Sequence, residues 1–286
     1  MQHFTAHRLT FNMRAVDTVE LNEHQGSALR GALFHALRRR FCAFAGQSEA
    51  ECGACALAQT CPVATLVSTL DPDHARGQDR PRPFTIQPPI VAGAGLNSSS
   101  GSASFTRHYW EREDGTGTFR YEPGEALTFG LTLYAQAMRL FPYVVLALQE
   151  FEEGGLGRKC EQYEGRWRRG RLQVCEIWAE NSLTGERQPV LRQGSRQVQV
   201  PEVPVTHEQI ERRAQDEGAR ARAALSGHDS PSDPSRFTLY FLTPTRLVEG
   251  GHLLKPENFR FRPFFQRLLE RLPEGERARL VNGCGS

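Results

Sequence analysis

The chain has 286 residues, 39% of them hydrophobic, which suits a soluble globular protein with one large domain or two small ones. Its 35 basic and 33 acidic side chains leave a formal charge of only +2, and only two of the basic residues, Lys159 and Lys255, are lysines, so mechanisms that need clustered lysines are excluded. No run approaches the roughly 18 apolar residues of a membrane span, and the N-terminus lacks the pattern of a secretory signal. We therefore expect a cytoplasmic protein that does not associate with a membrane.

The first two predicted elements are a strand and a helix. Residues 3–15 alternate partly between apolar and polar side chains, which predicts a half-buried strand. Within residues 24–41 the apolar spacing becomes helical. The side chains that recur on one face are Leu29, Leu33, Phe34 and Leu37. The opposite face carries Arg30 and Arg38, and His35 lies near the boundary between the two faces.

Four cysteines follow in a segment at about 42–84 that breaks this regularity. They have the spacing C-x9-C-x2-C-x5-C and are Cys42, Cys52, Cys55 and Cys61. Four thiolates can close a tetrahedral site, so we expect a structural zinc ion, with an iron–sulfur cluster as the alternative. A disulfide framework is disfavoured because nothing indicates export, and catalysis is disfavoured because four thiolates leave no open position for water. The other cysteines, Cys160, Cys175 and Cys284, are expected to be buried free thiols.

The remaining elements of the first 205 residues are predicted from the same periodicities. They are a short strand within 82–93, a flexible loop at 93–104, two alternating segments around a Pro-Gly turn within 115–135, a helix at 138–151, a strand at 171–180 and an extended segment that ends near residue 200. The order strand, helix, strand pair, helix, strand matches a ferredoxin-like unit, in which two helices cover one face of an antiparallel sheet. We therefore predict an α+β fold with a ferredoxin-like domain at 1–205, which carries the cysteine-rich insertion.

A second, incomplete unit is predicted after this domain. Residues 206–225 have the pattern of a helix that is polar almost all round, which is either a surface helix or a bridge between domains, and a linker-like stretch follows it to residue 235. The segments 236–247 and 257–272 then repeat the character of the opening strand and helix. Residues 236–286 number 51, which accommodates a strand and a helix but not a complete second ferredoxin-like domain. A natural short form, a truncated product and a subunit completed by another chain would each account for this length.

A glycine-rich run follows the second predicted helix and ends in two cations. Its members are Gly154, Gly155, Gly157, Arg158 and Lys159. Glycines let backbone amides approach a phosphate closely, and adjacent cations add attraction, although the C-terminal stop of a helix has a similar composition. Positive charge continues downstream at Arg166, Arg168 and Arg169, which favours an anionic partner.

Two histidines on the first predicted helix are candidates for proton transfer. His24 opens this helix, and His35 lies one turn from Arg38 and Arg39. Such a group could take a proton from a hydroxyl while the arginines offset charge on a pentavalent phosphate, as metal-free RNA cleavage requires. A partly buried structural imidazole is the alternative for His35. His108 is a third candidate, because its aromatic neighbours could stack on a base.

Taken together, these patches resemble the CRISPR precursor-RNA-processing endoribonucleases of the RAMP superfamily. The resemblance covers about 200 of the 286 residues, in the order of the family. It is carried by the segments LNEHQGSALRGALFHALRRRFC, CxxCxxxxxCP, RPFTIQPP, YEPGEALTFGLTL, LFPYVVLALQEFEEGGLGRKCEQYE, FTLYFLTPTRL and FRPFFQRLLERL. Each segment alone is loosely defined, whereas the set in this order is fairly specific.

The resemblance implies two ferredoxin-like domains that bind a CRISPR repeat RNA and cut it once. In this family a ribose 2′-hydroxyl attacks the neighbouring phosphate and leaves a 2′,3′-cyclic phosphate and a 5′-hydroxyl, without a metal ion in the reaction. Carried over to this chain, His35 is the first choice for proton transfer and His24 the second. Arg30, Arg38 and Arg39 would stabilise the phosphorane. The glycine-rich run, with the arginines that follow it, would contact the RNA.

Two other functions remain open on the same residues. The chain could be a non-catalytic RAMP subunit that holds the mature crRNA within a CRISPR effector complex, with other effector subunits as partners. It could also be an unrelated thiolate-metal module that binds nucleic acid. Cleavage of a repeat RNA in chelator separates the three, because the nuclease alone would cut one phosphodiester without a divalent metal.

Overall fold

The computed structural model of the chain describes residues 4–46, 52–68, 82–89, 109–111, 117–226, 247–249 and 252–269. Several predictions lie outside these ranges: the loop at 93–104, His108, the linker after residue 226, Cys284 and, apart from its last residue, the strand at 236–247. Within the described ranges, no helix has both the length and the apolar composition needed to pass through a lipid bilayer.

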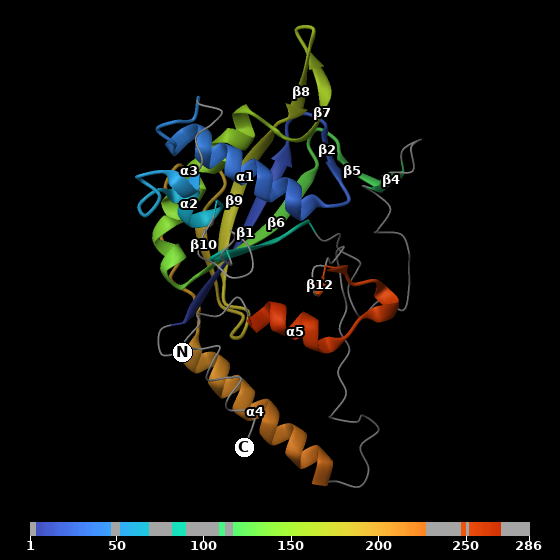
Figure 1. Cartoon of the computed structure of the whole chain (residues 1–286). Coiled ribbons are helices and arrows are strands. Elements are labelled where there is room, and N and C mark those ends of the chain that lie inside the picture. The colour runs from blue at the N-terminus through green and yellow to red at the C-terminus, as the bar shows by residue number, and fades with distance from the viewer. Residues whose placement is uncertain are drawn as a thin grey trace.

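The centre of the molecule is an antiparallel sheet with β1 (Thr5–Ala15) in its middle (Figure 1). The other long strands of the sheet are β3 (Phe84–Gln87), β6 (Ala126–Tyr134), β9 (Leu172–Glu180) and β10 (Arg187–Leu191). Their order is β10-β9-β1-β6-β3, and the short strand β11 (Val205–Thr206) pairs with the start of β1. The strand predicted at the N-terminus is therefore confirmed, as are the later predicted strands that join this sheet.

Two helices, α1 (Gln25–Phe41) and α3 (Phe141–Glu153), pack against each other and cover one face of the sheet (Figure 1). A 3-10 turn, η2 (Ala135–Leu140), leads into α3. The main elements follow one another along the chain as β1, α1, β3, β6, α3 and β9. When the strands of this series are numbered 1 to 4 along the chain, their order across the sheet is 4-1-3-2. This is the ferredoxin-like arrangement, so the predicted α+β fold is confirmed.

The core lies between these two helices and the sheet. Alternate residues of β1 point into it, and Leu9, Phe11 and Met13 are at most 1% exposed. The ring of Phe11 stacks on that of Phe129 in β6, with centroids 4.9 Å apart. The leucine face of α1 is buried as well. Because burying each such side chain contributes roughly 1.5–3 kcal/mol, this face fixes which side of α1 remains free for other contacts.

The insertions build a second, three-stranded sheet. It contains β2 (Val19–Asn22), β5 (Gly117–Tyr121) and β4 (Tyr109–Glu111), in the order β2-β5-β4. The two segments around the Pro-Gly turn therefore belong to different sheets and do not pair with each other. The turn is instead tied to the end of β1, since the Gly124 amide donates to the Ala15 carbonyl at 2.7 Å and the Ala15 amide donates to the Glu125 carbonyl at 2.9 Å.

The cysteine-rich insertion contains two short helices in the part that the structure describes. They are η1 (Cys52–Ala54) and α2 (Pro62–Leu66). Val63 and Leu66 of α2 are fully buried, and α2 contacts α1. This portion of the insertion is therefore docked on the core.

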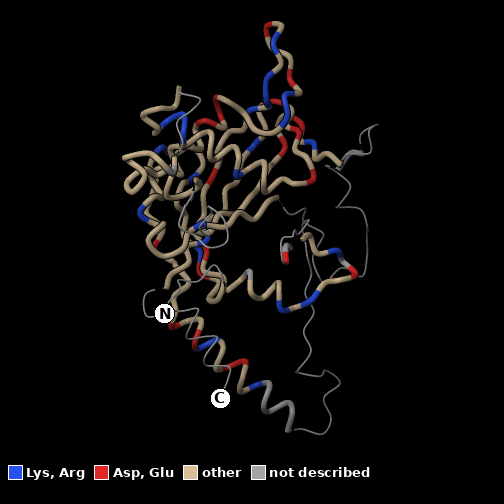
Figure 2. Tube along the Cα trace, in the orientation of Figure 1, with Lys and Arg blue, Asp and Glu red and all other residues tan. Residues whose placement is uncertain are grey.

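A β-hairpin that the sequence analysis did not predict projects from the body between α3 and β9 (Figure 1). Its strands are β7 (Leu156–Tyr163) and β8 (Arg166–Gly170), and we call residues 156–170 the hairpin arm. The two connecting residues, Glu164 and Gly165, have φ values of 49° and 75°, as the tight turn that matches strand twist requires. Figure 2 shows basic and acidic residues distributed along the arm.

The chain after the central sheet begins with α4 (His207–Ser226), which leads away from β11 (Figure 1) and is polar, as predicted. The described residues beyond it are the paired strands β12 (Val248–Glu249) and β13 (His252–Leu253), the turn η3 (Pro256–Asn258) and α5 (Phe261–Leu269). The helix predicted within 257–272 is therefore confirmed. A second ferredoxin-like domain at 236–286 stays a prediction, as do the predicted domain boundaries.

Candidate functional site

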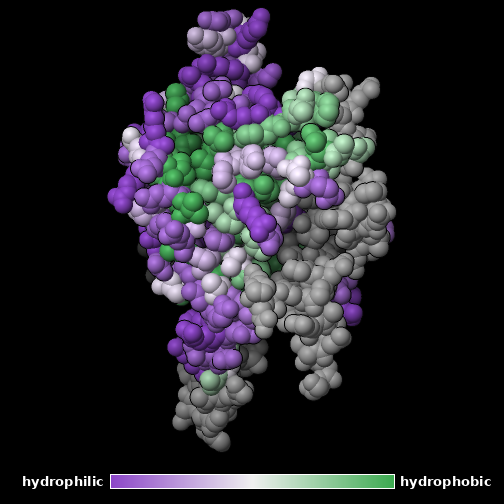
Figure 3. Space-filling view, turned by 90° about the vertical axis from the view of Figure 1, so that its left-hand side faces the viewer, coloured by the Kyte–Doolittle hydropathy of each residue, from purple (hydrophilic) through white to green (hydrophobic). Residues whose placement is uncertain are grey.

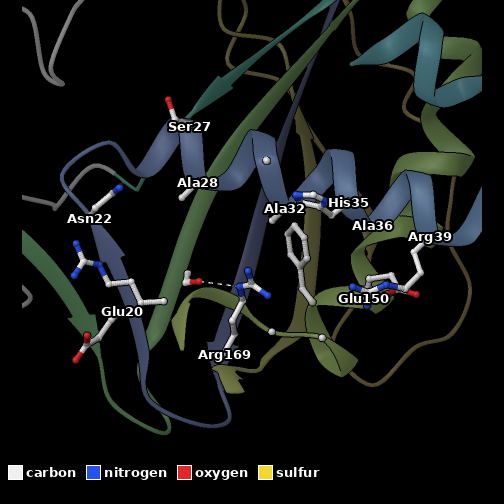
Figure 4. Close-up of a pocket in the computed structure, with 16 residues that line it drawn as sticks. Glu20, Asn22, Ser27, Ala28, Ala32, His35, Ala36, Arg39, Glu150 and Arg169 are labelled. Carbon is white, nitrogen blue, oxygen red and sulfur yellow. Dashed lines mark hydrogen bonds and ion pairs between the residues drawn. The ribbon is translucent and has the colours of Figure 1, made fainter. Parts of the chain in front are cut away.

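A pocket of about 440 Å³ lies between α1 and the base of the hairpin arm (Figure 4). Its walls come from β2, α1, the C-terminal end of α3 and both strands of the arm. The predicted site residues that line it are His35, Arg39, Gly154, Gly155, Gly157, Arg158 and Arg169. The fold therefore brings the first predicted helix and the glycine-rich run, which are more than a hundred residues apart in the sequence, to one hollow.

The α1 wall is concave because its side chains are small. His35 continues the row of Ser27 and Gly31 at four-residue intervals, and the neighbouring row on the pocket side consists of alanines. His35 is exposed, and its ring meets the Phe34 ring edge-on with centroids 5.4 Å apart. The alternative of a partly buried imidazole therefore does not describe His35, which stands at the pocket wall (Figure 4).

The opposite wall owes its shape to glycines that pack against backbone. A Cβ on Gly155, which has φ +70°, would lie 2.6 Å from the carbonyl oxygens of Arg169 and Gly170. A Cβ on Gly157, with φ +83°, would collide with the carbonyl of Glu20 in β2, and one on Gly170 with the carbonyl of Thr18. Gly157 and Gly170 therefore let the arm pack directly against the backbone around β2, and Gly155 lets the start of the arm pack against its second strand. This close backbone packing was not among the roles expected from the sequence, which were phosphate contact and a helix stop. Gly154 alone occupies the C-cap of α3.

A buried carboxylate organises the arginines at the end of α1. Glu150 is 8% exposed, and its side chain forms an ion pair of 2.7 Å with Arg39 (Figure 4). A longer ion pair of 3.8 Å joins Glu150 to Arg40. No sequence pattern predicts this role of Glu150, because an acidic residue within an apolar helix gives no signal of its partner. The Glu150 carboxylate therefore balances part of the charge of Arg39 and fixes its guanidinium at the edge of the pocket.

Two further guanidinium groups face the pocket from the arm. Arg169 donates from Nε to the Gly157 carbonyl at 2.9 Å, which holds its side chain across the glycine-rich run (Figure 4). Arg158 is exposed, and among the residues that the structure describes none forms an ion pair with it. The other acidic residue of the wall, Glu20, pairs with Arg120 at 3.6 Å. The cationic capacity of the pocket therefore lies mainly on the arm.

Three predicted residues of α1 are not among those that line the pocket. His24 is 58% exposed and has the carboxylate of Glu23 at 3.5 Å. Arg30 is exposed, and Arg38 is partly buried. His24 is the N-cap of α1, about three turns before His35, so it lies away from the pocket. Because the helix rotates by about 100° per residue, Arg30 and Arg38 leave α1 on other sides than His35.

The remaining predicted RNA contacts lie on the arm beyond the pocket. Lys159 and Arg166 are exposed. Arg168 is held in place, since it bonds Asp17 at 3.2 Å and lies 4.3 Å above the centre of the Tyr163 ring. Asp17 also accepts from Arg171 at 2.7 Å, and this bond lowers the pKa of the Asp17 carboxyl. Arg168 therefore has a structural task in anchoring the arm.

The four cysteines of the predicted metal site are all partly buried. Cys42, Cys52 and Cys61 pack against the core as free thiols, and Cys55 is a free thiol too. In the described part of the chain, no three side chains of His, Cys, Asp or Glu are grouped as metal ligands. The thiolate site, with a zinc ion or an iron–sulfur cluster, stays a prediction that metal analysis of the purified protein checks.

The other described cysteines, Cys160 and Cys175, are free thiols that are only partly buried. The Cys160 thiol donates to the Thr18 carbonyl at 3.2 Å, and burial raises the pKa of this thiol. A protonated thiol that serves as a hydrogen-bond donor at the base of the arm is a packing group and not a nucleophile.

The chemistry that the pocket offers is proton transfer beside cations. One imidazole on a rigid helix faces a wall with two arginines and with glycines that leave the backbone uncovered. An anionic group of the size of a phosphodiester could approach the arginines, and His35 could exchange a proton with it or with an adjacent hydroxyl.

A family model matches the larger part of the chain. The model of the AF_1859_N family, whose description is an N-terminal domain, matches residues 4–203. No curated protein matches the chain. Among solved structures, the Csm3-Csm4 subcomplex of a type III-A CRISPR-Cas interference complex contains a similar chain, with 11% identity, a TM-score of 0.38 and coverage of 67% of this chain and 92% of that one. Because the family match spans well over half of the sequence, the chain belongs to the AF_1859_N family.

Proposed function

We propose that the protein is an endoribonuclease that cleaves CRISPR repeat RNA without a metal ion. The observation that carries this proposal is the pocket in which His35 stands opposite Arg158 and Arg169. In the proposed reaction the ribose 2′-hydroxyl attacks the adjacent phosphorus, the 5′-oxygen of the next nucleotide leaves, and the products are a 2′,3′-cyclic phosphate and a 5′-hydroxyl. The choice of CRISPR repeat RNA as substrate rests on the resemblance of the sequence motifs.

We assign the following roles in this reaction to the residues that line the pocket. His35 exchanges a proton, either by taking it from the 2′-hydroxyl or by giving one to the leaving oxygen. Arg158 and Arg169 stabilise the charge on the phosphorane, which is the largest electrostatic demand of the reaction. Arg39, fixed by Glu150, orients the neighbouring phosphate. His24, Arg30 and Arg38 lie outside the lining, and we assign them no step of the reaction.

A non-catalytic RNA-binding subunit of a CRISPR effector complex is the second candidate function. One observation favours it. None of the described residues forms a hydrogen bond with the His35 imidazole, whereas a catalytic imidazole is usually oriented by one.

The two functions are separated by incubating an excess of protein with end-labelled repeat RNA in chelator. The nuclease cuts the RNA at a single phosphodiester, and the binding subunit retards the RNA in a gel and leaves it whole. Binding of repeat RNA no tighter than binding of a shuffled RNA contradicts both functions.

A further inference from the structure

The hairpin arm exposes two aromatic side chains near its tip. Trp167 is 59% exposed and Tyr163 is 53% exposed. The arm is otherwise hydrophilic, as the top of Figure 3 shows. The Trp167 indole packs no core on this polar projection, so its ring is available to stack on an external group.

The two rings lie on opposite faces of the arm. In β8, Trp167 and Arg169 are two residues apart and therefore share a face, whereas Arg168 points to the other face. Tyr163 lies on the Arg168 face, because the guanidinium of Arg168 covers its ring at 4.3 Å. Arg168 therefore covers one face of the Tyr163 ring, so the ring of Trp167 is the more accessible of the two.

The face of Trp167 continues into the pocket. Arg169, on this face, lines the pocket and is paired across the hairpin with Lys159, and Trp167 is paired with Gln162. Directly paired residues of an antiparallel ladder project from the same side. A continuous track therefore runs from the pocket wall past two cations and an amide to the indole.

The charge of the arm fits an anionic strand. Residues 156–170 contain five basic and two acidic side chains, a net charge of +3, which exceeds the +2 of the whole chain. The carboxylate of Glu161, one of the two acidic residues, accepts a hydrogen bond of 2.7 Å from the backbone amide of Thr18. A surface that combines spaced cations with an exposed aromatic ring is the arrangement by which proteins hold single-stranded nucleic acid.

We propose that the Trp167 face of the hairpin arm binds unpaired RNA next to the pocket, with a base stacked on Trp167 and the backbone along Lys159 and Arg169. The inference rests on the proposed function, since it concerns RNA that enters or leaves the same pocket. It names the substrate class: the RNA that flanks the reacting phosphate on this side is single-stranded, because bases within a duplex are stacked on each other and cannot stack on the indole.

The test compares three variants by fluorescence anisotropy. Trp167→Leu keeps an apolar side chain but removes the π face, Trp167→Phe keeps an aromatic ring, and Tyr163→Leu is the matched control on the opposite face. The probes are labelled oligoadenylate of about 12 nucleotides and the same strand annealed to oligouridylate. Because both aromatic residues are more than half exposed, thermal melting of each variant should match that of the unchanged protein.

The expected result is that Trp167→Leu weakens binding of the single strand by roughly 5-fold to 100-fold, that Trp167→Phe restores most of it, and that Tyr163→Leu changes it little. The unchanged protein should bind the duplex more weakly than the single strand. Equal binding by Trp167→Leu and the unchanged protein overturns the inference, and it is also the result expected if the arm contacts a partner protein. Equal loss in Trp167→Leu and Tyr163→Leu overturns it as well.

Cleavage of repeat RNA by the unchanged protein is measured in parallel. If the RNA is cut and Trp167→Leu binds normally, the inference fails while the proposed nuclease stands. If binding depends on Trp167 and the RNA stays whole, the inference holds and the nuclease fails.

Discussion

The two walls of the pocket are built by different means. The α1 wall is one face of a helix whose opposite face is anchored by buried leucines, and it presents small side chains and His35. The arm wall is held by backbone packed directly on backbone, at glycines where a Cβ would strike the chain around β2. The helix face therefore tolerates side-chain changes, whereas the arm depends on a few positions where no side chain fits.

The largest expected effect comes from a side chain at the tightest of these positions. Gly157→Ala places a Cβ against the Glu20 carbonyl in a backbone conformation with φ +83°. We expect a loss of roughly 3 kcal/mol of unfolding free energy, because strain and displacement of the arm add together. Thermal or denaturant unfolding measures it.

The control for this variant is Gly194→Ala, which has φ +76° but nothing within 4 Å of the added Cβ. It isolates the cost of the backbone conformation, about 1 kcal/mol. If both variants lose the same stability, close packing of the arm is not what makes Gly157 necessary.

The next effect concerns the chemistry assigned to the α1 wall. His35→Ala should slow single-turnover cleavage of repeat RNA by about 100-fold or more and leave RNA affinity nearly unchanged, as expected for a positioned acid or base. His24→Ala, on the same helix but outside the pocket lining, is the matched control. An unchanged rate in His35→Ala, or an equal loss in His24→Ala, would remove His35 from the reaction.

A smaller effect is expected from the charges of the arm wall. Replacing Arg158 and Lys159 with Ala should weaken RNA binding and flatten its salt dependence by about one log-log unit per lost phosphate contact. The same change at Arg192 and Arg196, exposed residues after β10, removes equal charge elsewhere. A salt slope that falls equally in both double variants would mean that the arm makes no localised phosphate contact.

The smallest effect concerns the anchor of the arm. The bonds from Arg171 lower the pKa of Asp17 in the folded protein below its ordinary value of 3.8. These bonds therefore stabilise the folded protein at pH values above 3.8, and this stabilisation disappears as the pH falls through the pKa of the folded state. Asp17→Asn should therefore cost about 1 kcal/mol at neutral pH. The difference between the two proteins should shrink as the pH falls below about 4.

Unfolding curves at several pH values measure this difference, with Asp216→Asn on the polar helix α4 as a carboxylate control. A gap between Asp17→Asn and the unchanged protein that stays constant from neutral to acidic pH would contradict the ionic anchor.

The same contrast explains what could be predicted from the sequence. Helical and strand periodicity arise from local burial, so β1, α1, α3 and the ferredoxin-like order were accessible. His35 was a candidate from the sequence, but it was expected near the boundary between the two helix faces, whereas it is exposed at the pocket wall. The pairing of Glu150 with Arg39 and the docking of Gly157 on Glu20 join residues more than a hundred positions apart, which leave no periodic trace. The hairpin turn at Glu164 and Gly165 did carry a local signal, a glycine between two polar and aromatic runs, which the sequence analysis overlooked.

Self-cleavage of RNA by a ribose hydroxyl in the pocket between α1 and the arm leaves characteristic ends on the fragments. Mass spectrometry of the fragments formed from repeat RNA in chelator identifies these ends. We expect one cut, with a 2′,3′-cyclic phosphate on the upstream fragment and a 5′-hydroxyl on the downstream one. A 5′-phosphate on the downstream fragment, or RNA that stays intact with saturating protein, would contradict this mechanism.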